Sequence, residues 1–178
     1  MQKLTCPIPE NINPIQNSGF NFSILKLPEI QYFCQEVNLP SLSISAAEGY
    51  VTPLVNIMHP GDKITFETLE VQFMIDEGFV NYTAIYNWII GLGFPESHSQ
   101  FADFITKNTS GVSNTPTLAS VSDAMLHILS PSGKIVKSIR FIDVFPVSLS
   151  SVTLSSTTSD VSYIVGTSSF AYTYYKFE

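Results

Sequence analysis

The stretch from Pro60 to Pro95 constrains the fold of this chain most, because a clear strand pattern runs directly into the one convincing helix pattern. A Pro-Gly-Asp turn is expected at residues 60–62, since proline fixes one φ angle and glycine permits a positive one. A strand is expected over residues 64–75 and a helix over residues 81–91. The other apolar patterns are typical of strands, so we expect the helix to cover a sheet built by the rest of the chain.

Within the expected strand, the apolar residues change parity near Glu67-Thr68, which predicts a bulge or a bend at that point. Beyond it, one parity is apolar through the residues Leu69, Val71, Phe73 and Ile75. Glu70 and Gln72 have the opposite parity. We therefore expect one face of the strand to pack under the helix and the other face to be polar.

The expected helix has start and stop signals as well as an apolar face. Asn81 is a candidate N-cap, and the preceding carboxylates of Asp76 and Glu77 are favourable near a helix N-terminus. Spacings of three and four place an apolar stripe along Tyr82, Ile85, Tyr86, Trp88, Ile89 and Leu92. Burial of each large side chain of such a stripe contributes about 1.5–3 kcal/mol, so loss of the stripe should abolish folding.

Alternating apolar residues predict further strands on both sides of this unit. Strand pairs are expected at residues 20–27 with 30–37 and at residues 123–129 with 135–145 around the turn Pro131-Ser132-Gly133. Residues 163–165 and 170–177 are expected to form the closing strand region. Residues 1–19 are expected to form an extended N-terminal arm, and residues 96–122 a polar insertion. The sum is a mainly β (α+β) single domain over residues 1–178, an antiparallel two-sheet sandwich or barrel with one flanking helix.

Residues 41–58 predict a strand, an exposed loop over residues 46–53 and a returning strand. The loop region carries Tyr50, Val51 and Leu54, which are unusually apolar for a loop. Apolar residues in an exposed loop often mark a contact with a partner. The alternative is a loop that folds back onto its own core, and the residues alone favour neither.

Charge argues against a nucleic-acid-binding surface. The net charge is −7, and the 8 lysines and arginines are scattered along the sequence, whereas tight phosphate binding needs clustered cations. Only 13% of the residues are charged, which is low for a soluble monomer and suggests that part of the surface is covered by other subunits. No apolar run approaches the length of a membrane span, so we expect no membrane insertion.

Catalytic and metal-binding patterns are weak. Two distant cysteines and three scattered histidines make no ligand set, so neither a metal nor another cofactor is expected. Cys34 is best explained as a buried free thiol. The adjacent carboxylates of Asp76 and Glu77 could mimic an acid/base pair, but a strand-to-helix junction explains them better. An enzyme or sugar-binding sandwich that uses this pair is the alternative from a different class.

Several short motifs, taken in order, resemble the tail tube protein family of contractile-tailed, T4-like bacteriophages. They cover residues 22–94 and 123–178 and comprise Cys34, Leu39-Pro40, Gly61-Asp62 with Phe66, Leu69-Glu70-Val71, Asp76-Glu77, Trp88, Phe141 to Pro146 and Tyr172 to Glu178. The N-terminal arm and residues 96–122 depart from the family pattern, and the loop at 46–53 keeps its position but not its residues.

The resemblance implies a structural protein and not an enzyme. Six copies would form a ring, and the rings would stack into a hollow conduit for DNA ejection. The implied partners are the chain itself, a sheath protein, baseplate or initiator proteins, and terminator proteins. DNA would pass through the lumen without specific binding. The expected location is the virion tail, assembled in the host cytoplasm. A tube initiator at the baseplate and the tube subunit of an injection system without DNA remain alternatives.

Two sets of site residues follow from the resemblance combined with the parity argument. The candidates for ring stacking lie in the loop region and are Glu48, Tyr50, Val51 and Leu54. The candidates for the lumen wall are Glu67, Glu70 and Gln72, because the opposite parity of that strand is committed to the helix. An acidic lumen would repel the DNA backbone.

Overall fold

The computed structural model describes residues 19–51, 56–93, 95, 97, 99–100, 120–155 and 163–178. The chain is mainly β, with antiparallel sheets and few helices, as the sequence predicts. Its larger sheet has the strand order β1 (Phe20–Ile24), β6 (Ser122–Leu129), β7 (Ile135–Leu149), β8 (Val165–Ala171), β5 (Leu69–Met74) and β2 (Cys34–Val37), with β9 (Tyr174–Phe177) paired to β7. A second sheet holds only β3 (Leu42–Val51) and β4 (Asn56–Phe66). Among the described residues, the structure has the helices α1 (Pro28–Phe33) and α2 (Val80–Gly93).

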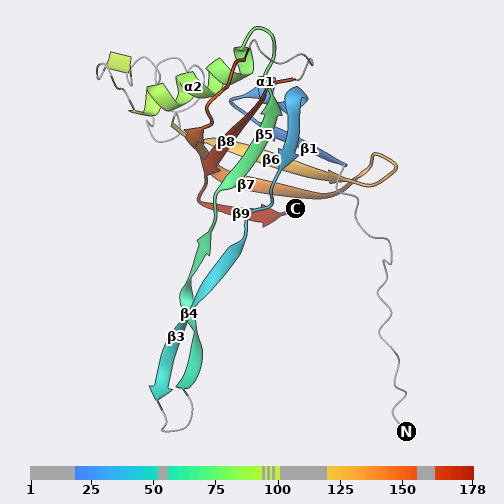
Figure 1. The fold of residues 1–178 in the computed structure, drawn as a ribbon. Helices are drawn as coiled ribbons and strands as arrows, with labels where there is room; N and C mark the ends of the chain where they lie inside the picture. Colours follow the sequence, from blue (N-terminus) through green and yellow to red (C-terminus); the bar gives the residue numbers. More distant parts are fainter. Residues whose placement is uncertain are drawn as a thin grey trace.

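The larger sheet folds into two layers because β7 takes part in both. Its first half pairs with β6 and β9, and its second half pairs with β8. The bend lies at Asp143, whose φ is +58°, a conformation that aspartate tolerates better than most residues. The Thr173 hydroxyl donates to the Asp143 carboxylate across 3.1 Å. The strands of the two layers cross one another in Figure 1.

The core fills the space between these layers and the helices. Its completely buried large side chains are Phe22, Phe73, Phe141, Phe170, Ile24, Ile30, Leu69, Ile85, Ile139, Val71 and Val144. α2 lies over one end of the body, and the β3–β4 hairpin projects from the opposite end (Figure 1). The chain therefore has two ends of very different shape.

The predicted hairpin of residues 20–27 and 30–37 is wrong. β1 pairs with β6 and β2 pairs with β5, and α1 lies between them in the sequence. Pro28 opens this short helix, a position that proline favours. A strand would place Ile30 and Tyr32 on one face, yet Ile30 is 1% exposed and Tyr32 is 88% exposed. The segment is too short for its helical period to be distinguished from a strand period.

The predicted turn at residues 60–62 is also wrong, because these residues lie within β4. In a two-stranded ribbon both strands are edges, so Pro60 can face outward without losing a ladder hydrogen bond. The register between β3 and β4 shifts between Ile44 and Ala46. Gly61 lies against Ser45 there, and a Cβ at Gly61 would collide with the Ser45 backbone and side chain. The close approach at this β-bulge, and not a turn, therefore explains why residue 61 is a glycine.

The parity change at Glu67-Thr68 marks a boundary between two strands and not a bulge within one strand. β4 ends at Phe66 and β5 begins at Leu69, and these strands belong to different sheets. The predicted strand over residues 64–75 is thus two strands joined by two residues. The parity change marks the passage from the projecting hairpin into the body.

The strands predicted at residues 123–129 and 135–145 are confirmed as β6 and β7, with different bounds. The strand predicted at residues 163–165 is wrong, because only its last residue belongs to a strand, and the one predicted at residues 170–177 is divided between the end of β8 and β9. The β6–β7 turn forms as predicted: Gly133 has a φ of +76°, and its N–H donates to the Ser130 carbonyl across 2.9 Å. β8 includes the polar residues 166–169 that were expected to lie between strands. Ser168 is fully buried there, and its hydroxyl donates to the Ser148 carbonyl across 2.9 Å. Because this hydrogen bond satisfies the hydroxyl, serine can occupy the interior of the sheet.

α2 is confirmed, but its start differs from the prediction. The Val80 N–H donates to the Asp76 carboxylate across 2.8 Å, so Asp76 and not Asn81 acts as the capping side chain. Asn81 is buried and donates to the Met74 carbonyl across 2.8 Å, which ties the helix to the end of β5. Ile85 and Trp88 are buried as expected, whereas Tyr86 is 51% exposed.

Candidate assembly surfaces

The shaft of the β3–β4 hairpin carries an apolar strip on one face. Leu42, Ile44 and Ile64, which we call the apolar strip, are each more than half exposed. Leu42 lies opposite Phe66 and Ile44 opposite Ile64 in the strand register, so these side chains share one face. Ser43 and Thr65 form the adjacent pair, on the other face. A contiguous apolar surface on an isolated ribbon indicates a contact surface.

The root of the hairpin is held by an aromatic cluster. The Phe66 ring lies 5.4 Å from the Tyr175 ring and 6.0 Å from the Tyr172 ring, measured between centroids. The Tyr175 hydroxyl donates to the Pro40 carbonyl across 3.4 Å. Pro40 precedes β3 and Phe66 ends β4, so both strands of the hairpin are anchored to the body. Burial raises the pKa of the Tyr172 hydroxyl to about 12.

Two of the three lumen candidates lie together on the outer face of β5. Glu70 is exposed and Gln72 half-buried, on the face opposite the buried side chains of the same strand. Their register partners on β8 are Ser169 and Thr167. Glu67 is exposed in the two-residue link that precedes β5. None of the three packs beneath α2, so the assignment of this face to a lumen stays a prediction.

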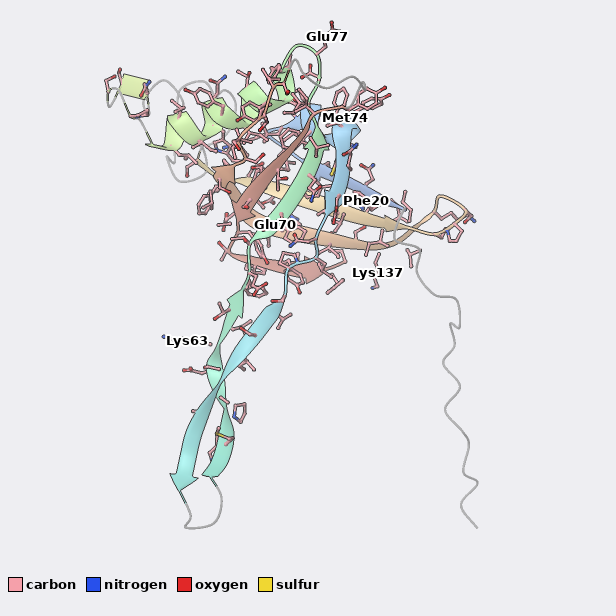
Figure 2. All side chains as sticks on the ribbon, viewed as in Figure 1. Phe20, Lys63, Glu70, Met74, Glu77 and Lys137 are labelled. Atoms are coloured by element: carbon pink, nitrogen blue, oxygen red, sulfur yellow. The ribbon has the colours of Figure 1, made fainter. Side chains whose placement is uncertain are left out.

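A further carboxylate on this face was missed by the sequence reasoning. Glu36 lies opposite Gln72 in the register of β2 and β5, and its side chain is exposed. Strand parity could not predict this neighbour, because β2 and β5 are separated in the sequence by the whole β3–β4 hairpin. We call Glu36, Glu70 and Gln72 the acidic face. Figure 2 labels Glu70 where the hairpin joins the body, with Lys63 farther along the shaft.

The stacking candidates and the carboxylate pair differ in what the structure says of them. The exposed loop predicted over residues 46–53 is wrong for residues 46–51, because β3 continues through them. Leu54 and the side chains of Glu48, Tyr50 and Val51 lie outside the described residues, so the assignment of this tip to ring stacking remains a prediction. The Asp76 carboxylate accepts a hydrogen bond from the Val80 N–H at the start of α2. Glu77 is exposed on the loop at the end opposite the hairpin (Figure 2). The structure therefore gives Asp76 a structural function at the helix start.

The Cys34 thiol is half-buried at the start of β2 and packs against the core. Burial raises its pKa from an ordinary value of 9.0 to about 11. Because the folded chain holds the thiol proton more tightly than the unfolded chain does, this group stabilises the fold below pH 9. The contribution is lost as the pH rises toward 11.

The thiolate, and not the thiol, reacts with alkylating agents. In a Cys6→Ser background at pH 8, we expect Cys34 to react with iodoacetamide about a hundredfold more slowly in the folded protein than in urea. Mass spectrometry of timed samples measures both rates. Equal rates in the two conditions would contradict the burial of this thiol.

Within the described part of the chain, no helix is long and apolar enough to cross a membrane. Among the same residues, no three side chains of the metal-ligating types lie together.

The layered sheets, the covering helix and the projecting hairpin form a fold that is also found in tube-terminating proteins of contractile injection systems. The whole chain superposes on the anti-feeding prophage tube terminating cap, with a TM-score of 0.61, 14% identity and 99% of both chains covered. A second match is the sheath/tube terminator of the extracellular contractile injection system PVC in its extended state. There the TM-score is 0.54, the identity is 14%, and 93% of this chain and 97% of that chain are covered. At these identities the matches establish the fold alone.

The family follows from the sequence. The model of the phage tail tube protein family matches residues 3–178, so the chain belongs to that family. It is also 27% identical to the tail tube terminator protein of Enterobacteria phage T4 over 147 aligned residues. The alignment covers 81% of this chain and 76% of the T4 protein. The resemblance found in the sequence motifs is thereby confirmed.

Proposed function

We propose that this chain is the terminator of a contractile-tail tube: a subunit whose single ring, of six copies, binds the last ring of the tube and ends its growth. The observation that carries the proposal is the relative from phage T4, which is named as a tail tube terminator and matches over 81% of this chain. Two solved structures of tube-terminating proteins share the fold. The terminator replaces the main tube subunit, which the sequence reasoning favoured, as the most specific function.

The geometry supports a subunit that works in a ring. β1, β2 and β9 each pair with a single strand of the larger sheet, and unpaired edges are sites where another chain can add a strand. The apolar strip supports a contact between the hairpin and a neighbouring subunit, because exposed aliphatic surface of this kind is stabilised when it is covered. The predicted stacking tip of the same hairpin, with Glu48, Tyr50, Val51 and Leu54, would lie beyond the strip. In this proposal the hairpin is the element that reaches the next ring.

The acidic face supports a lumen wall in the assembled ring. Its register partners on β8 are hydroxyl side chains, and its carboxylates come from two neighbouring strands. A wall of carboxylates and hydroxyls repels phosphate and gives DNA no site at which to bind tightly. The ring would thus continue the conduit for DNA ejection and would contact tube and sheath proteins in the virion tail.

Copy number tests this proposal. Quantitative mass spectrometry of purified virions should find about six copies of this chain per particle, as one cyclic ring requires. The main tube subunit should exceed that number many times over. Antibody-gold labelling should mark one end of the tube. A copy number in proportion to tail length would contradict the terminator and identify a main tube subunit.

A tube initiator is the second candidate, because a chain of the anti-feeding prophage baseplate also shares the fold, with a TM-score of 0.52, 10% identity and coverage of 93% and 96% of the two chains. One ring of initiator would give the same copy number as one ring of terminator. The end that carries the gold label distinguishes them. Gold at the baseplate end would contradict the terminator assignment.

A further inference from the structure

An open groove of about 420 Å³ lies on the outer face of the layer that contains β1 and β6, and no residue of the acidic face lines it. Apolar side chains on its rim are Leu25, Pro28 and Met125, and polar side chains are Gln31, Asp123 and Arg140. Leu25 is 84% exposed, and exposed aliphatic surface of this kind is stabilised when a bound chain covers it.

One ion pair defines the polar side of this groove. The Arg140 guanidinium donates to one carboxylate oxygen of Asp123 from Nε, at 3.2 Å, and from Nη2, at 2.5 Å. The guanidinium has five N–H donors, and those on Nη1 can bind a further acceptor such as a peptide carbonyl. The second oxygen of Asp123 can accept a peptide N–H. The groove therefore offers an apolar rim together with one donor and one acceptor, which suits an extended peptide.

We propose that this groove binds the N-terminal arm of a neighbouring copy of the chain. The inference rests on the proposed function, because it needs copies that stand side by side in a ring. The arm contains Pro7, Pro9 and Pro14, and the residue before each proline is biased toward extended backbone. Extended proline-rich backbone makes no internal hydrogen bonds, so its carbonyls are free to accept. Leu4, Ile8, Ile12 and Ile15 supply apolar side chains.

The arm belongs to the family domain, because the match to the family model begins at residue 3. Eighteen residues precede Gly19, and an extended chain of that length reaches up to about 60 Å. That reach exceeds the size of a compact body of this chain length. The arm can therefore extend to the next copy in a ring.

The direction in which the arm leaves the body favours the neighbour over the arm's own groove. The Leu129 N–H donates to the Gly19 carbonyl across 2.8 Å, which extends the β1–β6 ladder to the first described residue. The chain thus enters β1 at the end near the β6–β7 turn, whereas Leu25 and Pro28 of the groove follow the other end of β1. An arm bound in its own groove would have to reverse its direction beside Gly19.

A cross-link through the native Cys6 tests the inference. In a Cys34→Ala background, Gln31→Cys places a thiol in the groove, and Thr83→Cys places a matched exposed thiol on α2, which does not line the groove. Rings assembled from a mixture of isotopically light and heavy full-length chains are treated with a short bismaleimide. We expect Cys6 of one chain to be linked to residue 31 of another, with light–heavy pairs, and at least tenfold less linkage to residue 83.

A second variant tests the energetics. Leu25→Lys changes a side chain that is already 84% exposed, so folding should be retained. It should raise the dissociation constant of the ring about tenfold, as should deletion of residues 2–18. The two changes combined should have no larger effect than either one alone, because both remove the same contact.

The failures of the two proposals can be distinguished. Rings that form normally while Cys6 is linked only within its own chain, or not to residue 31, would overturn this inference and leave the terminator function intact. Rings unaffected by both the deletion and Leu25→Lys would also overturn it. A chain that stays monomeric alone and in the presence of tubes would overturn the proposed function and this inference together.

Discussion

Replacing the apolar strip with polar residues, in the triple variant Leu42→Ser, Ile44→Thr and Ile64→Thr, is expected to weaken the binding of the chain to tubes about a hundredfold while the body stays folded. Each side chain is more than half exposed, so covering it contributes about 1 kcal/mol, less than the value for full burial. Together the three changes should cost about 3 kcal/mol, which corresponds to a loss of affinity of about a hundredfold. Threonine preserves the strand propensity at the two isoleucine positions.

Co-sedimentation with preformed tubes measures this loss, and circular dichroism shows whether the sheets are intact. Ser43→Ala with Thr65→Ala is the matched control, because this pair occupies the opposite face of the same shaft. The control should bind within a factor of about two of the original chain, since isolated surface substitutions change free energies by less than about 0.5 kcal/mol. An equal loss in both variants would mean that the hairpin, and not its apolar face, was damaged.

The second large effect is expected at Trp88. Trp88→Ala should destabilise the fold by about 3–5 kcal/mol, because it deletes a buried aromatic side chain and leaves a cavity. Trp88 is 3% exposed. Its indole N–H donates to the Ser120 carbonyl across 3.1 Å, and the Lys26 ammonium lies 5.4 Å from the ring centroid. Since a domain has a stability of only about 5–15 kcal/mol, this single change can leave much of the protein unfolded.

Urea titration followed by circular dichroism measures the effect of Trp88→Ala. Tyr86→Ala lies half a turn earlier on the same helix and is the matched control, because Tyr86 is 51% exposed. Its cost should stay below about 1 kcal/mol. Similar losses at the two positions would contradict the orientation of α2, since the helix would then bury both faces equally.

Local pattern predicted the fold well where an element is long and has one clearly apolar face. β6, β7 and α2 belong to this group, as does the parity of Leu69, Val71 and Phe73. Pattern failed where the segment was short or its residues served a contact distant in sequence. The six residues of α1 do not span two turns, and buried Ser168 looked like a loop residue until its partner on β7 was known.

The candidate surfaces show the same division. Glu70 and Gln72 share a face because strand parity alone places them there, and this could be predicted. The addition of Glu36 requires the β2–β5 register. The groove requires Arg140 of β7 to meet Asp123 of β6, beside the residues that follow β1. Pairings of this kind depend on topology, which no local period encodes.

The two-residue link at Glu67-Thr68 has a mechanical consequence. β2 and β5 pair in the body, β3 and β4 pair in the hairpin, and the ladder is bridged by Asn38 N–H to the Glu70 carbonyl and by Glu67 N–H to the Ser41 carbonyl. The four strands form one long ribbon whose upper half is built into the core (Figure 1). A pull along the hairpin therefore loads β5 in shear. β2 and β5 both continue into the hairpin and are pulled together, so the hydrogen bonds that join β5 to β8 are the ones that lie across the pull. They resist it together, and the hairpin can bear tension without being peeled from the body.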